Sequence, residues 1–145
     1  MFKKFYNSYL AYVLVYTFYF LSFALFSSLI SVYMLGLGFS AGQTSVVVSV
    51  AFFASMLAQP VMGILNDRLS IKKVTLFSFG AIIFIAIYFM QARDLLGLTI
   101  GYSLVVMLIN GVNPVMDVLA ARSPYTYGKI RIWGTIGYAL GSQLA

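Results

Sequence analysis

Long apolar runs, separated by short polar or glycine-rich breaks, organise the whole chain. The first run covers residues 5–66 without a charged side chain, about three times the roughly 20 residues that one membrane-spanning helix needs. Three glycines fall within residues 36–42 of this run, and glycine readily adopts turn conformations. We therefore place a break there and expect two helices, at about 9–35 and 40–65.

Three further apolar segments follow. The charge-free runs at residues 74–92 and 95–116 are each long enough for one span, and we expect the second of these helices to continue to about residue 121. A last segment, at about 130–145, is too short to cross a bilayer. The pattern predicts an all-α integral membrane protein with about five transmembrane helices, the fifth of them truncated.

Composition excludes a water-soluble domain. Hydrophobic residues make up 62% of the 145 positions and charged residues only 8%, whereas soluble domains are roughly half apolar and about a quarter charged. The chain has no cysteine and no histidine, which removes thiolate metal sites, disulfides and the commonest general base. With only three acidic residues besides, we expect no metal, no cofactor and no enzymatic activity.

The net charge of +6 is explained by topology. A cytoplasmic N-terminus places Arg93 outside and eight basic residues inside, as the positive-inside rule requires: Lys3, Lys4, Arg68, Lys72, Lys73, Arg122, Lys129 and Arg131. We therefore expect a multi-pass protein of the cell membrane whose basic residues meet anionic lipid of the bilayer, with no nucleic-acid partner.

Asp117 is the acidic residue expected deepest in the membrane. An ionisable side chain at such a depth costs a few kcal/mol and marks a candidate functional site. Asn110 and Asn113 precede it at helical spacing, so the three side chains share one helix face, which we expect to line a cavity. In the alternative, Asp117 reaches the interface and pairs with Arg122 or Lys129, and the asparagines bond neighbouring helices.

Two faces are distinguishable on the fifth segment. Three glycines at spacings of three and four favour close approach of a neighbouring helix: Gly134, Gly137 and Gly141. The other face carries Arg131 and Tyr138, a guanidinium that binds hydroxyls or carboxylates and a ring that stacks on the apolar face of a sugar or base. We expect Asp117 and Arg131 to meet across one cavity. In the alternative, Arg131 is a basic residue at the membrane boundary.

Aromatic side chains form a stripe along the first helix. Within it, Tyr16 and Tyr19 lie deep enough that each hydroxyl needs a partner. They either contact a ligand or pack against the fifth helix.

The segment after the second helix contains a recognisable motif. Residues 63–73 read G-I-L-N-D-R-L-S-I-K-K, and this G-x-L-x-D-R-x-x-x-K-K pattern resembles the loop signature of the major facilitator superfamily: Gly63, Asp67, Arg68, Lys72 and Lys73. Gly63 permits close helix approach, and Asp67 can cap a helix or pair with a basic side chain. The basic residues anchor the loop at the anionic leaflet. The resemblance implies that this loop latches the two halves of a transporter in one conformational state.

Three further motifs resemble the sugar and nucleoside proton symporters of the lactose-permease type. They are Q-P-V-M-G at residues 59–63, N-P-V-M-D at 113–117 and G-K-I-R-I-W-G-T-I-G-Y-A-L at 128–140. The resemblance implies that Asp117 is the helix-four acid, Arg131 the sugar-binding arginine and Tyr138 the stacking aromatic residue.

This resemblance implies a secondary active transporter that works by alternating access. It would import a sugar, oligosaccharide or nucleoside together with protons. Residues 1–145 would be a partial N-terminal transmembrane domain of a fold with two six-helix halves, and the C-terminal half, which carries the coupling residues, would be missing. The alternative is a small self-contained membrane protein, either an oligomerising multidrug exporter or a non-transporting partner subunit. An exporter would need an acid deep in the first helix, which has none.

Overall fold

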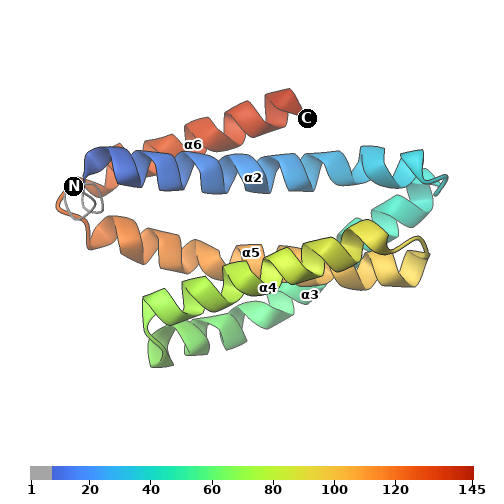
Figure 1. The fold of residues 1–145 in the computed structure, drawn as a ribbon, viewed down its shortest axis with the longest axis horizontal. Helices are drawn as coiled ribbons and strands as arrows, with labels where there is room; N and C mark the ends of the chain where they lie inside the picture. Colours follow the sequence, from blue (N-terminus) through green and yellow to red (C-terminus); the bar gives the residue numbers. More distant parts are fainter. Residues whose placement is uncertain (1–7) are drawn as a thin grey trace. The chain divides into compact units, whose positions relative to one another are not determined.

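The computed structural model describes residues 8–145, apart from the side chains of Asn66, Ile71 and Lys72. The Lys72 side chain of the predicted loop motif therefore lies outside the described residues, as do Lys3 and Lys4. The described part is helical throughout and contains no strand (Figure 1). Its five helices are α2 (Tyr9–Gly36), α3 (Ala41–Arg68), α4 (Ile71–Gln91), α5 (Leu95–Ala121) and α6 (Tyr127–Leu144). The predicted all-α class is confirmed.

Four of these helices are long and apolar enough to cross a membrane. The qualifying segments are Tyr9–Gly36, Ala41–Leu65, Lys73–Gln91 and Leu95–Ala121. Such helices pair most of their backbone N–H and C=O groups internally, which the hydrocarbon core demands. The 18-residue α6 is not among them, since it begins with the polar sequence around Lys129 and Arg131.

Local signals in the sequence account for the turn between α2 and α3. Gly38 adopts a φ of +91°, a backbone conformation that residues other than glycine rarely adopt. Ser40 then starts α3 with a reciprocal capping box: its Oγ accepts from the Gln43 N–H at 3.2 Å, and its own N–H donates to Gln43 Oε1 at 2.9 Å. The break predicted from the glycines is therefore present.

The next turn is shorter than expected. Helix α3 continues to Arg68, one turn beyond residue 65, and only Leu69 and Ser70 separate it from α4. Asp67 and Arg68 consequently belong to the last turn of α3 and not to a loop. The expectation that Asp67 caps a helix is wrong, because Ser70 occupies the N-cap position of α4.

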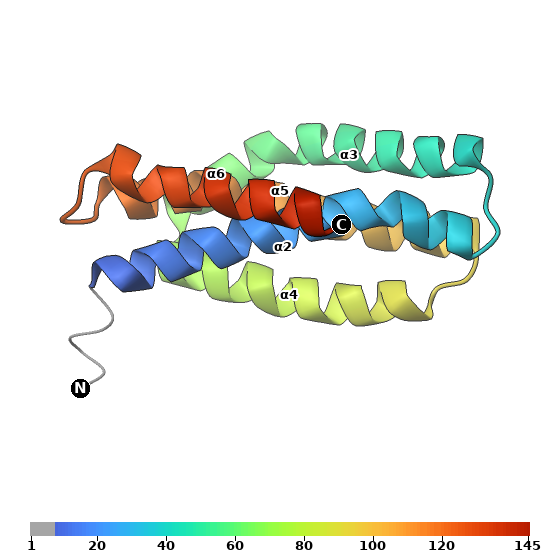
Figure 2. The same cartoon turned by 90° about the horizontal axis from the view of Figure 1, so that it is seen from above.

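The chain forms two compact units, residues 8–33 with 116–145 and residues 34–115. In the first unit α6 lies alongside α2 and runs in the same direction (Figures 1 and 2). A Cβ atom added to Gly137 would stand 2.9 Å from Thr17 Cα, and one added to Gly141 would stand 2.7 Å from Ala24 Cβ. The close helix approach predicted from the glycines of α6 is confirmed.

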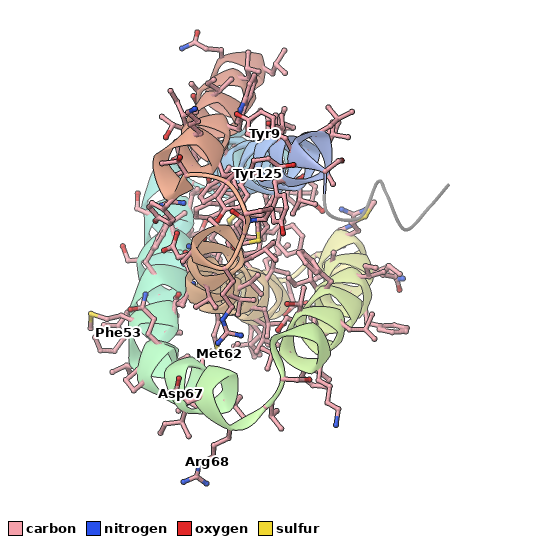
Figure 3. All side chains as sticks on the ribbon, turned by 90° about the vertical axis from the view of Figure 1, so that its left-hand side faces the viewer. Tyr9, Phe53, Met62, Asp67, Arg68 and Tyr125 are labelled. Atoms are coloured by element: carbon pink, nitrogen blue, oxygen red, sulfur yellow. The ribbon has the colours of Figure 1, made fainter. Side chains whose placement is uncertain are left out.

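A similar contact organises the second unit, which holds α3, α4 and most of α5. Met62 of α3 packs onto Gly111 of α5, where an added Cβ would stand 2.6 Å from Met62 Cε. On the other side of α5, Gly101 receives Phe89 of α4, with an added Cβ at 3.2 Å from Phe89 Cβ. Met62 therefore faces the interior of the unit, whereas Phe53, on the same helix, points outward and is 59% exposed (Figure 3).

The glycine contact between α6 and α2 can be tested by adding a single methyl group. We expect Gly137→Ala to destabilise the complete protein by about 1–3 kcal/mol, because the Thr17 backbone leaves no room for the methyl. Thermal unfolding in detergent would measure the change.

Gly128→Ala is the matched control on the same helix, because within residues 8–145 no atom beyond its own helix turn lies within 4 Å of its added Cβ. This variant should be neutral or more stable by up to about 1 kcal/mol, the usual helix-propensity gain. Equal stability of the two variants would contradict the packing described for Gly137.

Candidate functional site

A short, internally bonded turn brings the end of α5 next to the start of α6. Ser123 Oγ donates to the Ala120 carbonyl at 2.7 Å and accepts from the Tyr125 N–H at 3.3 Å, which closes the chain after α5. Thr126, in an extended conformation, then precedes α6. Side chains near the end of α5 therefore lie within reach of those in the first turns of α6.

Asp117 and Arg131 meet in this corner. Arg131 Nη1 lies 3.6 Å from Asp117 Oδ1, and the Tyr127 hydroxyl donates to the same oxygen at 3.1 Å. The side chains of Arg131 and Asp117 are 42% and 44% exposed. The structure thus brings together the acid and the base that we expected to meet. Among the described residues, Asp117 forms no ion pair with Arg122 or Lys129, the alternative partners.

An aromatic side chain of α2 supports the guanidinium. The Arg131 Cζ lies 4.9 Å from the centroid of the Phe20 ring, a cation–π geometry. Two tyrosine rings of the same helix pack against Phe20. The ring centroids of Tyr19 and Phe20 lie 5.1 Å apart, edge to face, and those of Tyr16 and Phe20 lie 6.1 Å apart. Arg131 is therefore positioned by a carboxylate on one helix and by an aromatic cluster on another.

The two deep tyrosines of α2 are buried. Tyr16 has no exposed surface, and its hydroxyl donates to the Met116 carbonyl of α5. A Cβ added to Gly134 would stand 3.2 Å from the Tyr16 ring, so this tyrosine also packs against α6. Of the two roles left open, the structure records helix packing for Tyr16. Ligand contact by Tyr16 or Tyr19 remains a prediction.

Tyr138 lies on the face of α6 that the glycines do not occupy. It is 44% exposed, and its ring meets Phe23 edge to face at 6.0 Å. Two helical turns separate it from Arg131, and Thr135 between them is exposed as well. This face therefore presents a cation, a hydroxyl and a ring in one row.

A second group of aromatic residues joins the start of α6 to α2 through hydrogen bonds and ring contacts. Trp133 Nε1 donates to the Tyr9 hydroxyl at 2.9 Å, and that hydroxyl donates to the Lys129 carbonyl at 3.0 Å. The ring of Tyr125 packs edge to face on Tyr9 at 5.2 Å and on Tyr12 at 6.0 Å. Figure 3 shows Tyr9 and Tyr125 close together. These contacts hold the turn of α6 that carries Arg131.

Sequence reasoning missed two residues of the site, Tyr127 and Phe20. Tyr127 precedes Arg131 by four positions, which places both on one face of α6, so helical spacing could have found it. No comparable signal existed for Phe20, because its contact with Arg131 depends on how α6 packs against α2.

The two predicted asparagines lie in the second unit. Asn110 Nδ2 donates to Ser55 Oγ of α3 at 2.9 Å, and Asn113 Nδ2 donates to Asn110 Oδ1 at 3.4 Å. The first bond is of the kind that the alternative reading expected, in which asparagines join neighbouring helices. A role for either residue in substrate binding remains a prediction.

The loop motif also belongs to the second unit. Within the described residues, no atom outside the Gly63 helix turn lies within 4 Å of a Cβ added to Gly63, so close helix approach at this position remains a prediction. Asp67 and Arg68 are exposed at the end of α3, as Figure 3 shows. Lys73 borders a cavity between helices.

No group of three or more potential metal ligands of the His, Cys, Asp and Glu types occurs within residues 8–145. The groups that meet at the site are one carboxylate, one guanidinium, a phenol and an aromatic ring face.

Comparison with known proteins identifies the family. The model of the MFS_1 like family, where MFS denotes the major facilitator superfamily, matches residues 9–144. The chain belongs to the major facilitator superfamily. It is 27% identical over 118 residues to a lactose permease of Citrobacter freundii. This alignment covers 73% of the present chain and 28% of the permease.

A second relative in the superfamily is a sucrose permease of Escherichia coli. It is 28% identical over 153 aligned positions, which cover 96% of this chain and 37% of the permease. The chain therefore spans about a third of the length of these two curated relatives. No solved structure matches the chain significantly.

The hydrogen bonds of Tyr9 provide a test of how α6 is held. We expect Tyr9→Phe to lower stability by about 1–3 kcal/mol, since two hydrogen bonds are lost, and to speed hydrogen exchange at the Trp133 indole N–H. Thermal unfolding and NMR of the indole proton would measure the two effects.

Tyr138→Phe serves as the control, because the Tyr138 hydroxyl forms no hydrogen bond with any residue between 8 and 145. It should change neither quantity. An unaltered indole exchange rate in Tyr9→Phe would rule out the bond between Tyr9 and Trp133.

Proposed function

We propose that this chain contributes helices to the N-terminal half of a secondary active transporter. The complete protein moves a sugar, oligosaccharide or nucleoside across the cell membrane by alternating access and couples this movement to protons. The family and the printed names of two relatives, lactose permease and sucrose permease, support a sugar as substrate. The function is binding and conformational exchange, without covalent catalysis.

The accessible Asp117–Arg131 pair carries this proposal. Both side chains are more than two-fifths exposed, and an exposed ion pair contributes only about 0–1 kcal/mol to stability. The pair is therefore not required to hold the fold together. Its charged groups are free to exchange their mutual contact for contacts with a ligand.

The geometry of the pair suits a polyhydroxylated ligand. A guanidinium offers several N–H donors in a fixed plane, and a carboxylate offers acceptors, so together they bind adjacent hydroxyl groups of one sugar ring. Phe20 and Tyr127 hold these groups in place before the ligand arrives, which reduces the entropy lost on binding. Tyr138, on the same face of α6 as Arg131, supplies an aromatic surface for the apolar face of the ring.

The site can be tested with the complete transporter in proteoliposomes and a panel of sugars and nucleosides. We expect uptake of at least one sugar, accompanied by proton movement in the same direction. Asp117→Asn and Arg131→Lys should each weaken binding of that sugar more than tenfold. The first removes the charge of the acceptor, and the second removes the bidentate geometry of the guanidinium.

Arg122→Lys is the matched control, since Arg122 is exposed outside the site. It should bind the sugar as the unaltered protein does. Unchanged affinity in both site variants would remove Asp117 and Arg131 from the pocket. Absence of uptake for the whole panel would contradict the proposed transport activity.

The orientation of the chain is a separate prediction. The basic residues favour a cytoplasmic N-terminus, which places the turn near Arg93 outside and the turn near Thr126 inside. The chain has no cysteine, so single cysteines at these two positions can be labelled cleanly within it. In intact cells a membrane-impermeant maleimide should react with Arg93→Cys and not with Thr126→Cys. The reverse labelling would invert the topology.

A further inference from the structure

The charged side chains of the first unit gather around the turn between α5 and α6. The described part of this unit has a single acidic residue, Asp117, near the end of α5. Its basic residues follow in the turn and in the first turns of α6: Arg122, Lys129 and Arg131. The other two acids of the chain belong to the second unit. Asp117 is therefore the carboxylate that opposes the positive charges of this corner.

Asp117 is held through one of its two carboxylate oxygens. Oδ1 lies 3.6 Å from Arg131 Nη1 and accepts from the Tyr127 hydroxyl at 3.1 Å, whereas Oδ2 accepts no hydrogen bond from a described residue. The guanidinium of Arg131 likewise donates no hydrogen bond within residues 8–145. Both side chains are more than two-fifths exposed. A ligand that reaches this corner therefore meets an available acceptor and available donors side by side.

This arrangement favours a ligand without net charge. Hydroxyl groups donate to the carboxylate and accept from the guanidinium, so one neutral molecule satisfies both groups. An anionic ligand that binds Arg131 has to take the place of Asp117, and it leaves that carboxylate unpaired beside a second negative charge. A cationic ligand at Asp117 meets the same conflict with Arg131. The ion pair therefore opposes ligands of either sign.

Arg131 has a second support that does not involve Asp117. Its Cζ lies 4.9 Å from the centroid of the Phe20 ring, on α2. If the carboxylate lost its charge, this contact would still hold the guanidinium in the corner. The exposed Arg122 and Lys129 would add to its positive charge. Such a corner attracts anions, so the negative charge of Asp117 is the feature that prevents this.

We propose that Asp117 determines the charge specificity of the site: it restricts binding to neutral solutes and excludes sugar acids and sugar phosphates. The inference rests on the proposed function, to which it adds the class of solute. It also states that neutralising this one side chain turns the site toward anionic sugars.

Isothermal titration calorimetry of the complete transporter in detergent tests this specificity. The probes are para-nitrophenyl β-D-glucopyranoside and β-D-galactopyranoside, each compared with its uronide, in which the C6 hydroxymethyl group is a carboxylate. The unaltered protein should bind at least one glycoside about tenfold or more tightly than its uronide, since like charges repel at this distance. Asp117→Asn should lower that preference at least about tenfold, because the glycoside loses a charged acceptor and the uronide gains a free guanidinium. Added salt should weaken uronide binding to this variant more than glycoside binding.

Three features make Asp117→Asn a clean test. It is nearly isosteric, it keeps an oxygen that accepts from Tyr127, and the exposed ion pair contributes little to stability. Asp117→Glu keeps the charge and should retain the preference for the glycoside. Asp94→Asn neutralises an acid of the second unit, where Asp94 Oδ2 accepts from the Gly97 N–H at 2.8 Å at the start of α5. Asparagine caps helices equally well, so this control should bind both probes as the unaltered protein does.

An unchanged preference in Asp117→Asn, an equal change in Asp94→Asn, or equal affinity of the unaltered protein for glycoside and uronide would overturn the charge specificity. In each of these cases the glycosides still bind, and the proposed function stands. Absence of glycoside binding to the unaltered protein would also overturn the inference. Uptake across the panel of sugars and nucleosides then decides the proposed function separately.

Discussion

The scarcity of water in a bilayer core is the constraint on which the rest of this structure depends. Backbone polar groups must pair within helices, and lipid surrounds apolar side chains as readily as protein does, so burial alone does not bring helices together. Close packing has to do so. Gly137 lets α6 approach the Thr17 backbone of α2, and Gly111 lets Met62 of α3 pack onto α5. Close glycine contacts of this kind occur in both units.

The candidate site follows from the first of these contacts. Because α6 lies directly on α2, Arg131 reaches the ring of Phe20, and the short turn after α5 places Asp117 beside it. Most polar groups around the corner have protein partners, as in the bonds that join Tyr9 to Trp133 and to the Lys129 carbonyl. The Asp117–Arg131 pair combines full charge with substantial exposure, which is the property that the proposed binding role requires.

Sequence reasoning succeeded where a signal is local or repeats along one helix. Apolar runs predicted the helices, the glycines of α6 predicted its close contact, and the placement of Asp117 and Arg131 on adjacent segments predicted their meeting. It failed where the outcome depends on where a helix ends. Asp67 belongs to a helix that continues one turn further than expected.

The sequence by itself determined that this protein is a bundle of membrane helices in the major facilitator superfamily, because hydropathy over about 20 residues and short motifs are properties of consecutive residues. Only the tertiary structure decided that the Phe20 ring of α2 supports Arg131. The physical reason is that contacts between helices depend on their rotation and register, which the pattern of one helix does not specify.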